Sequence, residues 1–97
     1  MIEVDLQIPD SIDEKTIVRI VEHVCMMNGL TCTLKGTLAK YPDSIHWHLK
    51  NGKQKGILEI TWWENEHRLW FKVAENRTSV WIKDNIPILK DQIEESV

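Results

Sequence analysis

Four consecutive segments between residues 30 and 73 alternate apolar and polar side chains, and this pattern constrains the fold more than any other feature of the chain. A period of two is typical of a β-strand with one buried face. The segments cover about 30–40, 45–50, 57–63 and 68–73. Because the turns between them are short, the segments can join only as antiparallel neighbours, and we expect a meander.

The turn lengths predict the register of the meander, since loop length fixes which residues stand opposite each other. The turns lie at residues 41–44, 51–54 and 65–66. In this register apolar residues face apolar residues in all three hairpins. The predicted pairs are Leu38 with Trp47, Trp47 with Leu58, and Trp62 with Leu69.

Other elements flank the meander on both sides. Residues 2–8 alternate apolar and polar, which predicts a further strand that ends at Pro9. Residues 11–14 have the spacing of a capping box, with Ser11 as the capping residue of a helix that continues to Asn28. Apolar residues recur at helical spacing from 82 to 93, where Pro87 either kinks one helix or separates two.

The order strand, helix, four strands, helix predicts a single α+β domain over residues 1–97. We expect a two-layer sandwich, in which a mainly antiparallel sheet carries both helices on one face. Two helices with one apolar stripe each cover only one face of such a sheet. The other face then meets solvent or a binding partner.

The parity of each strand divides the sheet into a covered face and an open face. The covered face should hold Leu38, Trp47, Leu49, Leu58, Ile60, Trp62, Leu69, Phe71 and Val73. The open face is basic and bears tryptophan. Its candidate binding residues are Trp63, Trp70, Arg68, Lys72, His46, His48, Lys35 and Lys50.

The open face admits two functional interpretations. Tryptophan and arginine are enriched in protein interfaces, so we expect a non-enzymatic interaction domain that binds a protein partner or itself. Unpaired edge strands could also join two copies across a two-fold axis. The alternative is single-stranded nucleic acid, with Trp63 and Trp70 as stacking platforms and the basic residues along the phosphate backbone.

His46 and His48 lie on one face of a strand, and two imidazoles at this spacing can supply two metal ligands. Glu59 is the plausible third ligand, on the neighbouring strand. Two ligands do not make a site, so we favour a solvated or hydrogen-bonded histidine pair and expect no metal. The sequence leaves the metal question open.

Nothing in the sequence favours an enzyme. His46 and Glu59 could form an acid–base pair, but no credible nucleophile lies near them, and no glycine-rich phosphate loop is present. We therefore expect no catalytic residue and no cofactor.

Composition sets the remaining expectations. The formal net charge is −3, which argues mildly against a general coat for duplex DNA. No segment has the apolar length of a membrane span, and the first residues do not resemble a signal peptide, so we expect a cytoplasmic protein that does not bind membranes. Cys25 and Cys32 should be thiols there, as small core residues.

Overall fold

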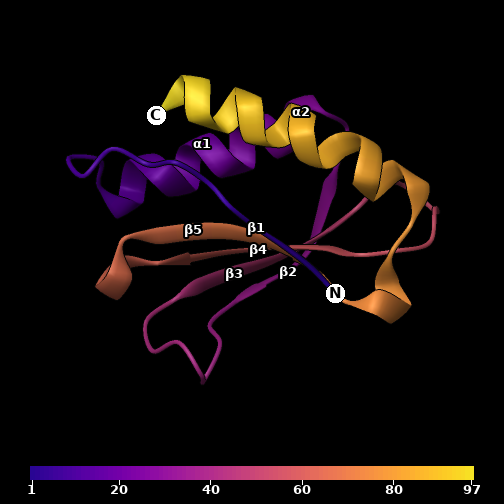
Figure 1. Ribbon diagram of the computed structural model, residues 1–97, viewed down its shortest axis with the longest axis horizontal. Helices are drawn as coiled ribbons and strands as arrows, with labels where there is room; N and C mark the ends of the chain where they lie inside the picture. The colour runs from indigo at the N-terminus through magenta and orange to yellow at the C-terminus, as the bar shows by residue number, and fades with distance from the viewer.

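The computed structural model describes residues 1–97 and has two layers, a five-stranded sheet and a pair of helices (Figure 1). Both helices lie on the same face of the sheet. Neither helix combines the length and the apolar character that a membrane span requires. The strands are β1 (Ile2–Asp5), β2 (Thr31–Gly36), β3 (Ile45–Lys50), β4 (Leu58–Trp63) and β5 (Arg68–Val73), and the helices are α1 (Glu14–Met27) and α2 (Val80–Ser96).

The strand order across the sheet is β1-β5-β4-β3-β2, and every neighbouring pair is antiparallel. The predicted α+β class and the β-α-β-β-β-β-α order are confirmed. The structure also places the first strand, which the sequence left beside either end of the meander: β1 pairs with β5. The two edges of the sheet are therefore β1 and β2.

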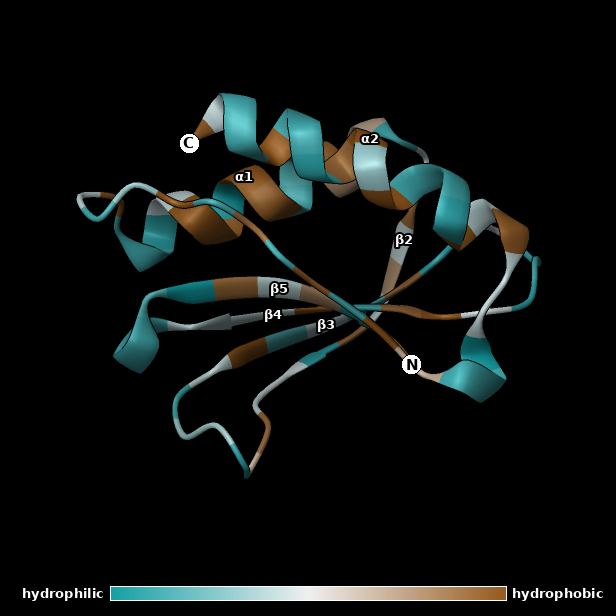
Figure 2. Cartoon of the chain, in the orientation of Figure 1, coloured by the Kyte–Doolittle hydropathy of each residue, from teal (hydrophilic) through white to brown (hydrophobic).

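One apolar core fills the space between the layers. In Figure 2 the apolar parts of both helices lie toward each other and toward the sheet. Eight of the nine residues predicted on the covered face are buried, and only Leu38 is not, because it lies in the loop after β2. Each large side chain buried there contributes about 1.5–3 kcal/mol to stability.

The three hairpin registers differ in how well they were predicted. The β4–β5 register is as expected, with Trp62 opposite Leu69. In β3–β4, Trp47 stands opposite Ile60 rather than Leu58, a shift of two residues that leaves every side chain on its predicted face.

The predicted β2–β3 register is wrong, and the error changes which β2 side chains lie on the open face. Trp47 pairs with Lys35 instead of Leu38, an odd shift of three residues that exchanges the faces of β2 from Leu34 onward. A bulge between Cys32 and Leu34 accompanies the shift. Leu34 consequently lies on the open face opposite His48, and Lys35 lies on the helix face.

The helix ends also differ from the prediction. Asp13 rather than Ser11 caps α1, because the Asp13 carboxylate accepts a hydrogen bond of 2.9 Å from the backbone N–H of Thr16. Pro87 lies inside α2, which continues past it as one helix.

The segment between β2 and β3 is a loop of residues 37–44, twice as long as the predicted turn. It lies on the side of the sheet opposite to the helices (Figure 1). The backbone N–H of Leu38 donates to Oγ of the buried Ser44, which closes the loop at its base. Part of the open face is therefore covered by the chain itself.

Candidate functional site

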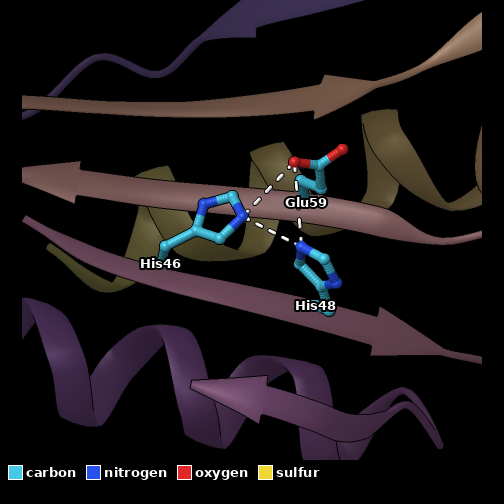
Figure 3. Close-up of side chains that lie close together, drawn as sticks. All are labelled: His46, His48 and Glu59. Atoms are coloured by element: carbon cyan, nitrogen blue, oxygen red, sulfur yellow. Dashed lines mark hydrogen bonds and ion pairs between the residues drawn. The ribbon is translucent and has the colours of Figure 1, made fainter. Parts of the chain in front are cut away.

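Three side chains converge on the open face of the two central hairpin strands. His46 and His48 project from β3, and Glu59 projects from β4 directly opposite His48 (Figure 3). Nε2 of His46 lies 3.0 Å from Nε2 of His48 and 3.3 Å from Oε1 of Glu59. Nε2 of His48 lies 3.8 Å from the same carboxylate oxygen. Three potential ligand atoms thus share one small volume.

Thr61 holds the His46 ring in place from the other side. It stands opposite His46 on β4, and its Oγ1 lies 2.7 Å from Nδ1 of His46. Thr61 is 1% exposed and His46 is 4% exposed, so the surrounding protein encloses both side chains. The remaining ring nitrogen, Nε2, is the one that faces His48 and Glu59.

Burial sets the ionisation of the cluster. It is the largest effect on His46 and lowers its pKa below the ordinary value of 6.5. The nearby His48 lowers the pKa further, Glu59 raises it, and Lys72 lowers it by a smaller amount. The His46 imidazole is therefore neutral at neutral pH.

The two tryptophans predicted on the open face are on that face, but they are not free. Trp70 is only 2% exposed. The ring of Tyr41, from the 37–44 loop, packs edge-on against Trp63 at 5.0 Å and against Trp70 at 5.1 Å between centroids. Nε1 of Trp63 donates to the carbonyl oxygen of Pro42, which ties the same loop down. The expectation that both rings are exposed is wrong, and Trp70 offers no free platform for a base.

Arg68 also packs on Trp70, with its guanidinium carbon 4.0 Å from the ring centroid. It also donates to Asp5 at 2.7 Å and to Glu3 at 2.8 Å, both on the edge strand β1. These bonds, led by the one to Asp5, raise the pKa of Arg68. The positive charge of Arg68 is thus paired with the carboxylates of Asp5 and Glu3.

Lys35 does not belong to the open face. Its ammonium lies 2.6 Å from Oε2 of Glu22 on α1, and the same oxygen accepts a hydrogen bond of 3.0 Å from Nε1 of Trp47. Lys35 is therefore removed from the predicted basic surface. The reversal of β2 places it at the helix layer instead.

Lys50 and Lys72 are half-buried on the open face, at different places. Lys72 lies on β5, between Glu3 of β1 and Glu59 of β4 in the pairing. Lys50 ends β3 opposite Thr31. The predicted open-face cations therefore do not form one continuous basic track.

A second feature was missed by reasoning from the sequence: an apolar hollow of about 570 Å³ between α1 and the edge strand β2. Most of its lining is hydrophobic, and the exposed Met26 and Cys32 lie at it. Lys35 lines the hollow because β2 is reversed after its bulge, so that Lys35 stands opposite Trp47 where Leu38 was expected. The methionine pair at residues 26–27 was the only hint in the sequence.

The two cysteines differ in their surroundings. Cys25 is buried, and this burial is the main reason that its pKa is raised to about 12, with smaller contributions from Cys32 and Glu22. Cys32 is exposed on β2. Both are free thiols, and the expectation that both are core residues holds for Cys25 alone.

Comparison with known proteins finds no family model, no curated protein and no solved structure that matches this chain.

Proposed function

We propose that this chain is a non-enzymatic interaction domain that binds a second copy of itself through the edge strand β2. The observation that carries the proposal is the exposure of this strand: all six residues of Thr31–Gly36 are exposed. One side of β2 pairs with β3, and the other side has no neighbouring strand. An unpaired strand edge is a ready template for another strand.

The two edges of the sheet are not equivalent. The opposite edge, β1, has four residues, and two of them are the acids Glu3 and Asp5. Short, charged edge strands resist pairing with another chain. The β2 edge has six residues with Lys35 as its one charge, and Glu22 neutralises that charge. The length and the charge of the two edge strands therefore favour association at β2 over association at β1.

The hollow beside β2 adds apolar surface to the same edge. A two-fold axis perpendicular to the sheet, beside β2, would pair the two β2 edges antiparallel and keep both hollows on the same face, next to each other. Met26, which is 63% exposed at the hollow, would then lose contact with water. Glu22 and Lys35 give the hollow one charge of each sign, so two copies meet without net repulsion.

This proposal keeps the predicted role and moves it to another surface. Tyr41 and Arg68 cover the tryptophans that were expected to form the centre of the interface. Nucleic-acid binding loses support for the same reason. A cytoplasmic location is part of the proposal, because two free thiols suit a reducing compartment.

Light scattering after size exclusion tests the proposal directly. We expect the wild-type chain to elute as a dimer whose stability changes little with salt. Leu34→Lys, which places a charge on the β2 edge, should give a monomer. Ile88→Lys on α2 is the matched control because Ile88 and Leu34 are both 47% exposed, and it should remain a dimer. A monomeric wild-type chain would disprove the proposal.

Cross-linking locates the interface. A bismaleimide that spans about 10 Å, or about three residues along a strand, should join two chains through the exposed Cys32. Cys32→Ser should abolish the product. A labelled single-stranded oligonucleotide, added to the same sample, should leave the tryptophan fluorescence unchanged. Quenching that salt reverses would favour nucleic acid instead.

A further inference from the structure

We propose that His46, His48 and Glu59 bind a divalent transition-metal ion, with Zn²⁺ as the best fit, on the face of the sheet opposite to the helices. This inference is independent of the dimer. It rests on the distances between the three ligand atoms, on the way the sheet holds them, and on the chemistry of the donor set.

The distances between the three ligand atoms are close to those of a metal site. The sides of the triangle formed by the two Nε2 atoms and Oε1 measure 3.0, 3.3 and 3.8 Å. The point equidistant from its corners is about 2.0 Å from each of them. Bonds from zinc to histidine nitrogen and carboxylate oxygen are about 2.0–2.2 Å long. An ion near the centre of the triangle thus reaches all three ligands at ordinary bond lengths.

The hydrogen bond to Thr61 prepares His46 as a ligand. If Nδ1–H of His46 donates to Oγ1 of Thr61 at 2.7 Å, the lone pair of the ring lies on Nε2 and points at the cluster. His48 can then offer only one proton, on its Nε2, to two acceptors, Nε2 of His46 and Oε1 of Glu59. A cation would satisfy all three atoms at once. Metal-bound histidines typically donate their second nitrogen in this way.

The scaffold is rigid and the site is accessible. β3 and β4 are central strands of the sheet, and His48 and Glu59 are directly paired across them. The side chains of His46, Glu59 and His48 are 5%, 14% and 20% exposed. An ion can therefore enter past His48 while most of its surroundings stay protein.

The donor set selects the kind of metal. Two imidazoles and one carboxylate suit zinc and its first-row neighbours, whereas calcium and magnesium prefer oxygen ligands alone. Neither cysteine contributes: Cys25 is on α1, and Cys32 stands opposite Leu49, on the helix side of the sheet. Three protein ligands leave at least one coordination position for water or for an incoming ligand.

Titration of the metal-free wild-type chain with Zn²⁺ in a calorimeter tests the proposal. We expect one ion per chain. His48→Gln and Glu59→Gln should each weaken binding by about 100-fold, and Thr61→Val, which removes only the hydroxyl that orients His46, by about 10-fold. The matched control is His23→Gln, because His23 is an exposed histidine on α1 away from the cluster. It should bind like the wild type.

Two further measurements distinguish the loss of a metal ligand from the loss of the fold. Circular dichroism establishes that each variant is folded before titration. Co²⁺ in place of Zn²⁺ should give visible d–d absorption without the intense near-ultraviolet band of a cobalt–thiolate bond. The proposal fails if the wild type binds less than one equivalent of Zn²⁺ in excess metal. It also fails if folded His48→Gln binds as tightly as the wild type, or if the thiolate band appears.

Discussion

Tyr41 changes what the open face presents to solvent. Its ring lies against both Trp63 and Trp70, and the guanidinium of Arg68 also lies over the Trp70 ring. Edge-on aromatic contacts of this kind each contribute about 0.5–1.5 kcal/mol beyond the area they bury. Tyr41 therefore packs two potential binding side chains, Trp63 and Trp70, into one aromatic cluster on the open face.

Replacing Tyr41 should expose Trp63 and Trp70 to solvent. We expect Tyr41→Ala to lower the free energy of unfolding by about 2 kcal/mol, since it removes two aromatic contacts, and to shift tryptophan emission to longer wavelength. Tyr41→Phe keeps both contacts and should behave like the wild type. Urea unfolding followed by fluorescence measures both effects. Equal stability of the alanine and phenylalanine variants would show that the ring does not hold the loop down.

Glu22 links α1 to the sheet through Lys35 and Trp47. Burial, the largest single effect, raises its pKa, but the hydrogen bonds from Lys35 and Trp47 together outweigh it and leave the pKa below the ordinary value of 4.5. A carboxylate with a lowered folded-state pKa stabilises the fold above its unfolded pKa. This stabilisation is lost as the pH falls through the folded-state pKa.

The stability of Glu22→Gln should therefore depend on pH in a defined way. At about pH 7 the variant should be less stable than the wild type, because the charged acceptor is gone. As the pH is lowered toward about 2, the wild-type carboxyl itself becomes protonated, so the difference should shrink. Urea unfolding at both pH values measures the difference in the free energy of unfolding between the variant and the wild type. A constant difference would mean that the Glu22 charge plays no part.

At the scale of the elements, the β3–β4 loop depends on one glycine. Gly56 has φ of +101°, and a Cβ atom there would lie 2.8 Å from the carbonyl oxygen of Arg77 and 2.9 Å from side-chain atoms of Ser79 and Ile82. The loop is therefore pressed against the start of α2. Gly52, in the same loop, also has a positive φ, of +58°, but its Cβ position is open.

These two glycines form a matched pair for a stability experiment. Gly52→Ala should cost about 1 kcal/mol from backbone strain alone. Gly56→Ala adds a clash with backbone and should cost about 3 kcal/mol or more. Thermal or urea unfolding of both variants measures the difference. Similar losses at both positions would show that the loop can move away from α2.

At the scale of the whole molecule, the helices and sheet share one core. A single cluster joins residues of α1, α2 and the sheet strands β3, β4 and β5, and it includes Trp47, Trp62 and Trp81. No part of this core would survive the loss of either layer. We expect one cooperative transition on unfolding.

Two probes should then report the same transition. Tryptophan fluorescence follows the core, and circular dichroism follows mainly α1 and α2. Their urea midpoints should coincide for the wild-type chain measured at a single protein concentration. Separate midpoints would indicate that the helical layer detaches before the sheet unfolds.

The sequence predicted the candidate site in part. It placed His46, His48 and Glu59 on one face, since alternation in β3 and β4 is regular and a shift of two residues preserves it. It named Glu59 as the plausible third ligand, but it did not predict that Thr61 orients His46 or how closely the three ligand atoms approach one another. Those facts depend on the exact β3–β4 register. A slip of two residues between the predicted and the observed register moves a cross-strand partner by about 7 Å.

The sequence by itself determined the strand and helix order, the antiparallel meander and most of the core, because hydrophobic periodicity and short turns are local properties. Only the tertiary structure decided the face of β2, the covering of Trp70 and the place of β1. Each depends on contacts between distant residues: the β2 bulge reverses side chains, the 37–44 loop folds back, and β1 has no turn to fix its neighbour. The free β2 edge follows from the strand order, and the convergence of His46, His48 and Glu59 follows from the β3–β4 register.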